Sequence, residues 1–225
     1  MTSGSDASHM ALQELLGQLR EDLYRGRDGK VAEVVSRALS QGMAPGGILS
    51  DGLIAGMDEV GRDFRDGKLY MPEVLVAARA MKAGLRVLEP HLAGSGAATL
   101  GRVVLGTVAG DIHDIGKNLV AIMMEGAGFE VLDLGIDRST EDFVAAVRET
   151  RPHILGMSAL LTTTMPAMGK VVEALRTEGL REGLVVLMGG APLTPAFAQA
   201  MGADAYCRDA AVAVDTAKAL LRGRE

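Results

Sequence analysis

Short apolar, β-branched runs alternate with stretches of helical periodicity through the second half of the chain, and this alternation limits the possible folds more than any other feature. The expected strands are Arg102–Val108, Glu130–Leu134, Ile154–Ser158, Leu184–Met188 and, more weakly, Ala205–Cys207. The expected helices cover about residues 116–127, 140–150, 165–178, 195–201 and 211–222. Apolar strands separated by helices indicate a parallel sheet covered on both faces. The sequence therefore predicts an α/β domain with a doubly wound, flavodoxin-like five-stranded sheet, a Rossmann-like arrangement that binds ligands at the carboxyl ends of its strands.

The first half of the chain carries only helical patterns. Apolar residues recur at helical spacing over four stretches, at about residues 12–19, 31–39, 45–64 and 72–89. Gly42 is expected to cap the second helix, Pro45 and Pro72 to open the third and fourth, and Pro90 to stop the last. Four helices joined by short connections predict an antiparallel four-helix bundle.

Composition indicates where these domains begin and end. Residues 1–10 are polar, small and rich in Ser, and we expect a leader or a disordered tail there. Residues 93–100 are rich in small residues, Gly and Ser, which is typical of a linker, with Gly94–Gly96 as a candidate hinge. The prediction is thus a helical domain over residues 11–92 and an α/β domain over residues 101–225.

Charge and hydropathy argue against several classes of function. The formal net charge is -6, which disfavours a nucleic-acid binder, since such a protein needs a basic face. No apolar run reaches the roughly 18 residues that a membrane-spanning helix needs, and no signal peptide is visible. With a single cysteine, Cys207, the chain cannot form a disulfide framework or a cysteine metal cluster. We therefore expect a cytoplasmic protein.

Asp111 and His113 lie in the loop after the first expected strand, where ligands bind in this class of fold. A histidine there can ligate a metal, and a carboxylate two residues earlier can fix the tautomer of its ring. One histidine with one aspartate is, by itself, more typical of an ordinary loop histidine. The other histidines, His9, His91 and His153, lie in the leader, at the linker and before a strand, so a zinc site with three or four protein ligands is not predicted. A metal at His113 would need further ligands from elsewhere, such as a macrocycle.

Two later strand ends carry hydroxyls and glycines. The third strand leads into Ser158–Thr164, which has four hydroxyl side chains and almost no charge, and the fourth leads into Gly189-Gly190. Taken separately, these are an ordinary helix cap and an ordinary glycine turn. No glycine-rich phosphate-binding pattern follows the first strand, so a nucleotide phosphate loop is not predicted.

Taken together, the three strand ends resemble a known signature. Asp111-x-His113-x-x-Gly116, then Ser158-x-Leu160, then Gly189-Gly190, at intervals of about 42 and 29 residues, is similar to the cobalamin-binding signature of methionine synthase, B12-dependent mutases and methyltransferase corrinoid proteins. The segment Gly56–Pro72 resembles the helical cap that precedes the cobalamin domain of methionine synthase. The best overall resemblance is to the small two-domain corrinoid proteins of methanol, methylamine and methoxyaromatic methyl transfer, and it covers nearly the whole chain after the leader.

The resemblance implies that a cobalamin or related corrinoid binds with its own base displaced, in the base-off/His-on mode. His113 would be the lower ligand of cobalt, and Asp111 would orient its ring. Thr164 stands where methionine synthase has a serine that continues this relay to solvent. Phe64 and Met71 match cap side chains that cover the upper, methyl-bearing face, although methionine synthase has a leucine at the position of Met71.

The remaining matched positions are assigned to the nucleotide tail of the cofactor. Those expected to line its slot or to make room for it are Ser158, Leu160, Thr162, Gly116, Gly189 and Gly190. Asp114, next to the expected ligand, completes the cofactor-binding set. None of these residues would stand out without the resemblance, because each also has an ordinary role in a turn or a helix cap.

The function that the resemblance implies is methyl carriage. Co(I) takes a methyl group from an activated donor, and methyl-Co(III) passes it to an acceptor. The expected partners are a substrate-specific methyltransferase, an acceptor methyltransferase that uses tetrahydrofolate or a thiol, and a reductive activase. The chain itself is the methyl-carrier component, and the sequence leaves its donor, its acceptor, the form of the corrinoid and the oligomeric state open.

Three other functions stay as alternatives. A cobalamin-based sensor would join the same two domains to a DNA-binding module, and no such segment is recognised. A mutase subunit would use adenosylcobalamin and would not need the helical cap. A flavodoxin-like domain without a corrinoid would leave the three coinciding motifs unexplained.

Overall fold

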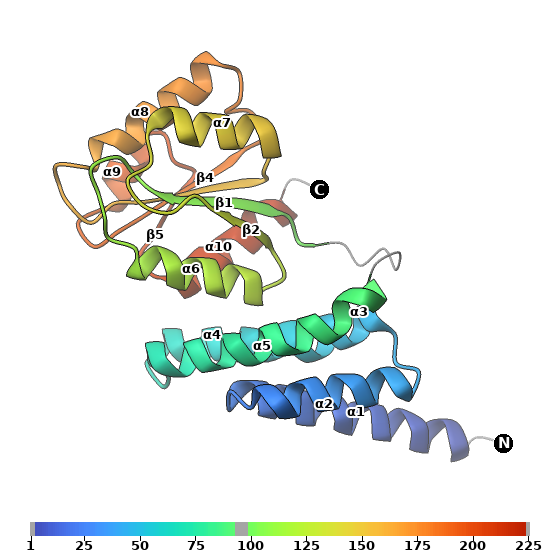
Figure 1. Ribbon diagram of the computed structural model, residues 1–225. Coiled ribbons are helices and arrows are strands. Elements are labelled where there is room, and N and C mark those ends of the chain that lie inside the picture. Colours follow the sequence, from blue (N-terminus) through green and yellow to red (C-terminus); the bar gives the residue numbers. More distant parts are fainter. Residues whose placement is uncertain (1–2, 93–98, 224–225) are drawn as a thin grey trace. The chain divides into compact units, whose positions relative to one another are not determined.

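The structure of this chain is a computed structural model that describes residues 3–92 and 99–223. The chain divides near residue 98 into two compact units, a helical unit and an α/β unit, which are described in turn (Figure 1). Most of the expected linker, residues 93–98, lies outside the described residues, and so does the candidate hinge at Gly94–Gly96. Across the described residues, no helix has the length and apolar character needed to cross a membrane.

The described part of the helical unit is built from helices alone. They are α1 (Ser3–Tyr24), α2 (Asp28–Ser40), α3 (Pro45–Gly47), the π-helix η1 (Ile48–Ile54), α4 (Ala55–Arg65) and α5 (Met71–Leu92). Because α3, η1 and α4 follow one another without interruption, these residues form four helical rods (Figure 1). The predicted helical bundle is confirmed.

The rods pack through the apolar faces that the periodicity predicts. α2 buries Val31 and Val35, and α5, which packs against it, buries Val74 and Met81. A fully buried side chain of this kind stabilises the fold by about 1.5–3 kcal/mol relative to an exposed one. The bundle is therefore held by its core and not by the helix propensities of its polar surface.

Three local predictions for this unit need correction. α1 begins at Ser3, so Ser3–Met10 are helical and do not form a disordered tail. Once packing has nucleated a helix, each further residue other than proline adds to it at little cost. α5 runs on to Leu92 and contains Pro90 in its last turn, where the missing amide hydrogen removes only one helical hydrogen bond. The π-helical stretch η1 interrupts the third predicted helix, and apolar spacing alone did not indicate it.

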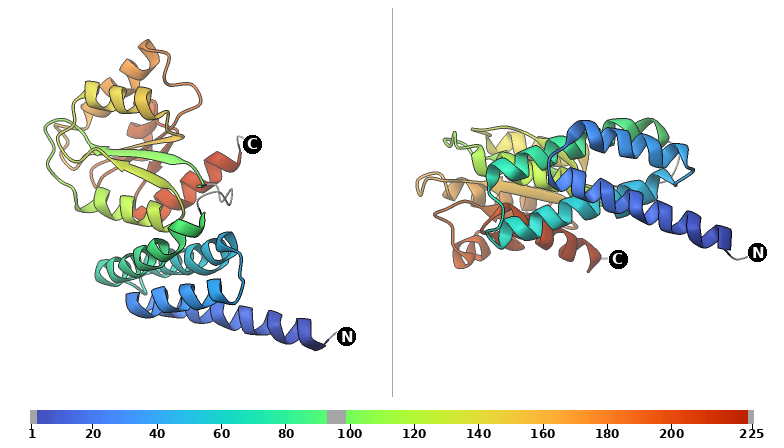
Figure 2. Two further views of the ribbon diagram at one scale, coloured as in Figure 1. Left: turned by 45° about the vertical axis from the view of Figure 1, so that its right-hand side comes forward. Right: turned by 90° about the horizontal axis from the view of Figure 1, so that it is seen from below.

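The α/β unit alternates strands and helices as predicted, with boundaries within one residue of those expected. Its elements are β1 (Arg102–Thr107), α6 (Ile115–Gly126), β2 (Glu130–Asp133), α7 (Thr140–Thr150), β3 (Ile154–Ser158), α8 (Pro166–Thr177), β4 (Val185–Gly189), α9 (Pro195–Ala200), β5 (Ala205–Cys207) and α10 (Ala210–Arg222). All strand pairs are parallel, in the order β2-β1-β3-β4-β5. α7 and α8 cover one face of the sheet, and α6 and α10 cover the other (Figures 1 and 2). The predicted flavodoxin-like order is confirmed.

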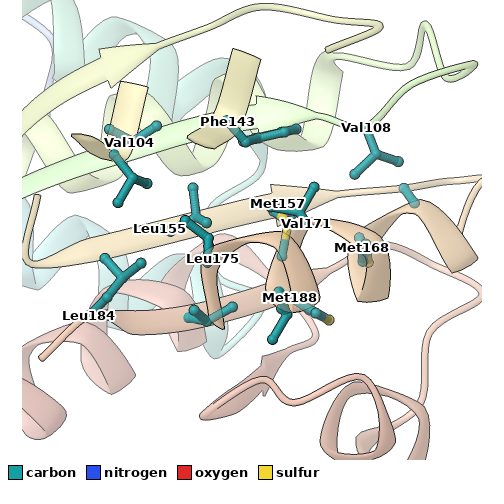
Figure 3. Packing of buried hydrophobic residues seen from close by; sticks show 14 of the residues in the cluster. Val104, Val108, Phe143, Leu155, Met157, Met168, Val171, Leu175, Leu184 and Met188 are labelled. Atoms are coloured by element: carbon teal, nitrogen blue, oxygen red, sulfur yellow. The ribbon is translucent and has the colours of Figure 1, made fainter. Parts of the chain in front are cut away.

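A hydrophobic core of this unit lies between the sheet and helices α7 and α8. Figure 3 shows Val104 of β1, Leu155 of β3 and Met188 of β4 packed with Phe143 of α7 and Val171 of α8. All five side chains are almost completely buried. The two-sided burial of these strands explains why they are continuously apolar in the sequence.

The register of the strands places three motif-bearing ends level with one another. Thr107 of β1 is paired with Ser158 of β3, and Ser158 is paired in turn with Gly189 of β4. The loops that follow these residues therefore emerge side by side at the carboxyl edge of the sheet. Segments that lie about 40 and 30 residues apart in the sequence meet there, where this class of fold binds its ligands.

Candidate functional site

Asp111, in the loop between β1 and α6, is completely buried and accepts hydrogen bonds on both carboxylate oxygens. Oδ1 accepts from the backbone amide of His113 at 3.1 Å and lies 2.7 Å from Nδ1 of the His113 ring. Oδ2 accepts from the amides of Leu160 and Leu161, at 2.7 and 3.2 Å, and from Oγ1 of Thr164 at 2.8 Å. One buried carboxylate thus joins the β1–α6 loop to the β3–α8 loop.

These hydrogen bonds keep Asp111 ionised. Burial by itself raises the pKa of this carboxyl, because the charged form loses its water. The amides of Leu160 and His113, and then the side chains of His113 and Thr164, bond to the charged form, and together they hold the pKa well below its ordinary value of 3.8. Asp111 is therefore negatively charged at neutral pH.

His113 turns one ring nitrogen inward and presents the rest of its side chain, 46% exposed, to solvent. Because an ionised carboxylate can only accept hydrogen bonds, Nδ1 carries the ring hydrogen. In the neutral ring, Nε2 then has the free lone pair and is suited to bind a metal. Within residues 3–92 and 99–223, no group of three or more His, Cys, Asp or Glu side chains is placed to hold a metal ion. The two residues singled out in the sequence are thus in direct contact at the predicted strand end.

Large apolar side chains are exposed in both loops that Asp111 connects and at the first residue of α6. Ile112 and Ile115, on either side of His113, are 70% and 67% exposed, and Leu160 and Leu161 are 40% and 42% exposed. Clusters of exposed apolar surface typically mark a binding site. Of these four residues, sequence reasoning named only Leu160; the signal that could have revealed the others is a run of large apolar residues in loops that are expected to be polar.

Thr164 continues the chain of hydrogen bonds from His113 and Asp111 into the interior of the unit. Its side chain is buried, and Oγ1 lies 2.8 Å from Oδ2 of Asp111 and 2.9 Å from the carbonyl oxygen of Leu161. A hydroxyl has one hydrogen to donate, and the ionised carboxylate is the stronger acceptor. A continuous path therefore runs from His113 Nδ1 through Asp111 to Thr164 Oγ1.

The glycines of the motif differ in what surrounds them. Gly190 has a φ of +140°, and a Cβ atom there would lie 1.8 Å from the carbonyl oxygen of Ala159. At Gly189 a Cβ atom would lie 3.1 Å from the carbonyl oxygen of Cys207, whereas at Gly116 it would meet nothing within 4 Å. Gly189 therefore allows the end of strand β5 to approach closely, Gly190 does the same for the start of the β3–α8 loop, and Gly116 borders open space.

The other predicted positions lie at the same edge of the sheet. Ser158 ends β3, and its carbonyl oxygen accepts from the amide of Val108 at 3.1 Å. Thr162 is exposed in the β3–α8 loop. Asp114 immediately precedes α6, and its Oδ2 accepts from Nδ2 of Asn118 at 3.0 Å. The structure thus brings the predicted residues of this unit together around one edge.

Lys117 is a buried charged residue that sequence reasoning did not select. It lies in the first turn of α6 and is 4% exposed. Its Nζ donates to Oδ1 of Asn118 at 2.6 Å and to Oδ2 of Asp133, at the end of β2, at 2.5 Å. A lysine is ordinarily exposed, so no sequence pattern marked this one.

Phe64 and Met71 belong to the helical unit and lie on either side of the turn between α4 and α5. Phe64 is partly buried, and Met71 is 36% exposed. Gly67, with a φ of +72°, reverses the chain between them. Its amide donates to the carbonyl oxygen of Phe64 at 3.1 Å, and the amide of Lys68 donates to that of Asp63 at 2.8 Å. This pair of hydrogen bonds is a glycine-based helix end.

Asp63 holds the same turn through its side chain. Its carboxylate accepts from the hydroxyl of Tyr24 and from Nζ of Lys68, both at 2.8 Å. The hydrogen bond from Lys68, and then that from Tyr24, lower the pKa of Asp63, and the bond to Asp63 raises the pKa of Tyr24. Sequence reasoning missed Tyr24 and Asp63, because their partnership joins α1 to α4 and leaves no local pattern.

Two family models match the chain, and each describes a B12 binding domain. One covers residues 101–217 and the other residues 15–89. Dimethylamine corrinoid protein 1 of Methanosarcina mazei is 45% identical over 213 residues, which cover 94% of this chain and 98% of that protein. The chain belongs to this family of corrinoid proteins.

Further relatives of this corrinoid protein agree with the assignment. Trimethylamine corrinoid protein 2 of Methanosarcina mazei is 41% identical over 93% of this chain and 97% of that protein. A chain of the methanol:cobalamin methyltransferase complex from Methanosarcina barkeri matches with a TM-score of 0.83 and 32% identity, over 93% of this chain and 80% of that chain. The predicted function, a corrinoid-binding protein that carries methyl groups on cobalt, is confirmed at this level.

The residues around His113 fit a corrinoid. A macrocycle over the ring would cover Ile112, Ile115 and the two exposed leucines, whose exposure to water is otherwise unfavourable. The open space beside Gly116 leaves room for an additional group. His113 offers a single nitrogen ligand, which is sufficient for a metal whose other ligands come from a macrocycle.

Proposed function

We propose that this corrinoid protein holds its cofactor in the base-off/His-on mode, with Nε2 of His113 as the lower ligand of cobalt. The observation that carries the proposal is the 2.7 Å contact between Nδ1 of His113 and the buried, ionised Asp111. That contact leaves the lone pair on Nε2, in a side chain that is half exposed. A carboxylate on the second ring nitrogen also raises the basicity of a metal-binding histidine.

We further propose that the methyl group comes from a methylated amine. The cobalt of a bound corrinoid supplies a centre that accepts a methyl group and releases it again. The relatives named for dimethylamine and trimethylamine are 45% and 41% identical to this chain, each over at least 93% of its length. This similarity to corrinoid proteins named for methylated amines supports an amine as the donor.

The proposed partners are two methyltransferases. One takes the methyl group from the amine, and the other passes it to an acceptor such as tetrahydrofolate or a thiol; a reductive activase restores the cofactor after accidental oxidation. A similar chain occurs in the methanol:cobalamin methyltransferase complex, which supports a direct complex with the first of these enzymes. Selection among amines would take place in that enzyme.

His113, Asp111 and Thr164 are proposed to couple ligation to a proton. Release of the ring from the metal would free Nε2 to accept a proton from solvent, and renewed binding would return that proton to solvent. Asp111 would keep its hydrogen bond to Nδ1 in both states. Thr164 donates to the other carboxylate oxygen, so Asp111 stays ionised in both states.

The remaining predicted residues are proposed to enclose the rest of the cofactor. Phe64 and Met71 would cover the upper face and move aside when a partner approaches the cobalt. Around the nucleotide tail we propose Asp114, Gly116, Ser158, Leu160, Thr162, Gly189 and Gly190. The open space at Gly116 and the exposure of Leu160 and Thr162 support this placement.

The decisive test of the lower ligand uses His113→Ala, with His91→Ala as a matched control because His91 is exposed in the helical unit. Each protein is loaded with cobalamin and reduced to Co(II), and the EPR splitting from the axial nitrogen is recorded with unlabelled and 15N-labelled chains. The wild type and His91→Ala should change from a triplet to a doublet on labelling, which only a protein nitrogen can cause. His113→Ala should lose this signature and bind the cofactor at least about 100-fold more weakly. An unchanged signature and affinity would overturn the proposal.

The donor is tested by mixing the reduced, corrinoid-loaded chain with purified methyltransferases for dimethylamine, trimethylamine and methanol, each with its own substrate. Methylation of the corrinoid, followed by the visible spectrum, should be fastest with an amine-specific enzyme. Faster methylation from methanol than from every amine would overturn the amine assignment and leave the lower ligand unaffected.

A further inference from the structure

A second chain of hydrogen bonds, separate from those of Asp111, holds the start of α6. Lys117 has a side chain that is only 3% exposed, and its ammonium bonds both to Asp133 of β2, at 2.5 Å, and to Oδ1 of Asn118, at 2.6 Å. Nδ2 of the same Asn118 side chain donates to Oδ2 of Asp114 at 3.0 Å. The chain therefore runs from the end of β2 to the residue that follows His113.

Both ends of this chain are fixed. Oδ1 of Asp133 accepts from the amide of Gly135 at 2.8 Å, which holds the carboxylate at the strand end. Asp114 also accepts through its backbone carbonyl, from the amide of Asn118 at 2.7 Å. Movement of the residue beside His113 is thus opposed by a side-chain bond and a backbone bond.

His113 consequently lies between two anchored neighbours. Asp111, two residues before it, is bonded to the β3–α8 loop, and Asp114, directly after it, is bonded through Asn118 and Lys117 to β2. The carbonyl oxygen of His113 itself accepts from the buried hydroxyl of Thr107 at 3.0 Å. Asp111 orients the ring, while the lysine chain restrains the backbone that carries it.

A lysine is not needed at this position to pack the helix. The other buried positions of α6, such as Leu119, Met123 and Met124, are filled by apolar side chains that pack against the rest of the unit. Burying an ammonium group is costly, and an apolar residue of similar size often packs as well or better. What Lys117 adds over an apolar residue is its pair of directed hydrogen bonds.

We propose that Lys117 is a positioning residue for the lower ligand of cobalt, acting on His113 through Asn118 and Asp114. This inference rests on the proposed coordination by His113. Lys117 does not touch the cofactor in this role; it keeps the first turn of α6 in the geometry from which the imidazole meets the metal. Partners of metal ligands commonly change metal affinity by about 10- to 100-fold when removed.

The test compares Lys117→Met, which keeps the length of the side chain, with Asn118→Ala, which breaks the connection and leaves the Lys117–Asp133 pair in place. Lys170→Met is the matched control, because Lys170 is exposed on α8 of the same unit. The measurements are cobalamin affinity, the His-on fraction in the Co(II) EPR spectrum, and the NMR signals of the His113 ring in the protein without cofactor.

Lys117→Met and Asn118→Ala should each lower cobalamin affinity by about 10-fold or more and should lower the His-on fraction. In the cofactor-free protein they should broaden or split the ring signals of His113, while Lys170→Met leaves all three measurements unchanged. The EPR and NMR readouts separate a positioning role from a general loss of stability, because they report on the folded molecules alone.

The proposal would be overturned if either variant folds and keeps the wild-type cobalamin affinity, His-on fraction and His113 ring signals. If Lys117→Met fails to fold, Asn118→Ala alone decides the question. The proposed function is judged separately by His113→Ala. If His113→Ala abolishes the protein-nitrogen signature while both new variants behave as wild type, only the role of Lys117 fails. If His113→Ala keeps that signature, the coordination and the role of Lys117 fail together.

Discussion

In the α/β unit, the residues around His113 are tied by hydrogen bonds to a buried carboxylate. In the helical unit, Phe64 and Met71 lie on either side of a turn that is held by a partly exposed ion pair. Asp111 is completely buried and accepts from two loops. Asp63, which holds the turn between α4 and α5, is paired with Lys68, whose side chain is 62% exposed. Exposed ion pairs of this kind contribute little to the stability of the fold.

This difference matches the different tasks proposed for the two units. A lower ligand that must meet cobalt in one geometry benefits from a prebuilt, rigid support. A cover over the methyl-bearing face has to move aside for a partner enzyme, and tight hydrogen bonding would oppose that motion. Substitutions should therefore have large effects in the first region and small ones in the second.

Asp111→Asn should have the largest effect, because it removes the charge at the centre of the rigid region. An asparagine side chain has one oxygen, so it can accept hydrogen bonds on one side only. Its NH2 group would then point at other donors, either the amides of Leu160 and Leu161 or that of His113, and could bond to none of them. We expect unfolding to become easier by about 3 kcal/mol at pH 7, measured by urea denaturation of the cofactor-free protein. A loss below about 0.5 kcal/mol would mean that the region is not held together by this carboxylate.

The same comparison has a defined pH dependence. In the folded protein the pKa of Asp111 lies below its ordinary value of 3.8. The ionised carboxylate therefore contributes its full stabilisation above pH 3.8, and this stabilisation is lost as the pH falls from there through the lower pKa of the folded state. The difference in stability between the wild type and Asp111→Asn should therefore shrink on acidification from pH 7 to pH 3. A difference that grows over this range would contradict the assigned direction.

Thr164→Val should have an intermediate effect, because Asp111 loses one of its donors and keeps the amides of Leu160 and Leu161. We expect a loss of about 1 kcal/mol in unfolding free energy, together with a weaker His-on signature when cobalamin is bound. Thr164→Ser retains the hydroxyl and is the control, which should recover most of the signature. Equal behaviour of the two variants would show that the hydroxyl does not support His113.

Met71→Ala should have the smallest effect on stability, because Met71 is 36% exposed. We expect the unfolding free energy to change by less than about 1 kcal/mol and the amount of retained cobalamin to stay the same. If Met71 covers the upper face, added cyanide should react faster with the bound corrinoid, as seen in the visible spectrum. A large loss of retained cobalamin would instead place Met71 among the residues that hold the cofactor.

Local patterns were sufficient to predict the two-domain fold and the edge of the sheet at which the candidate site lies. Continuous apolar strands between amphipathic helices specify a parallel sheet, since side-chain periodicity is a property of neighbouring residues. The parallel sheet then implies that ligands bind at the carboxyl ends of its strands, and Asp111 and His113 follow β1 at that edge. Their assignment to a corrinoid came from the resemblance of three such strand ends to the cobalamin-binding signature. The segment Ser3–Met10 was misjudged because its composition resembles a tail although it continues α1.

Only the tertiary structure decided how His113 is supported. Two of the donors to Asp111 are backbone amides at Leu160 and Leu161, and every residue except proline has such an amide, so no side chain marks them in the sequence. The burial of Lys117 depends on Asp133 arriving at the end of β2, which is a consequence of strand order. The sequence by itself determined the fold and, through the resemblance of its motifs, pointed to His113 as the proposed metal ligand. Contacts between distant loops, which local periodicity cannot encode, decided the geometry in which the His113 ring is held.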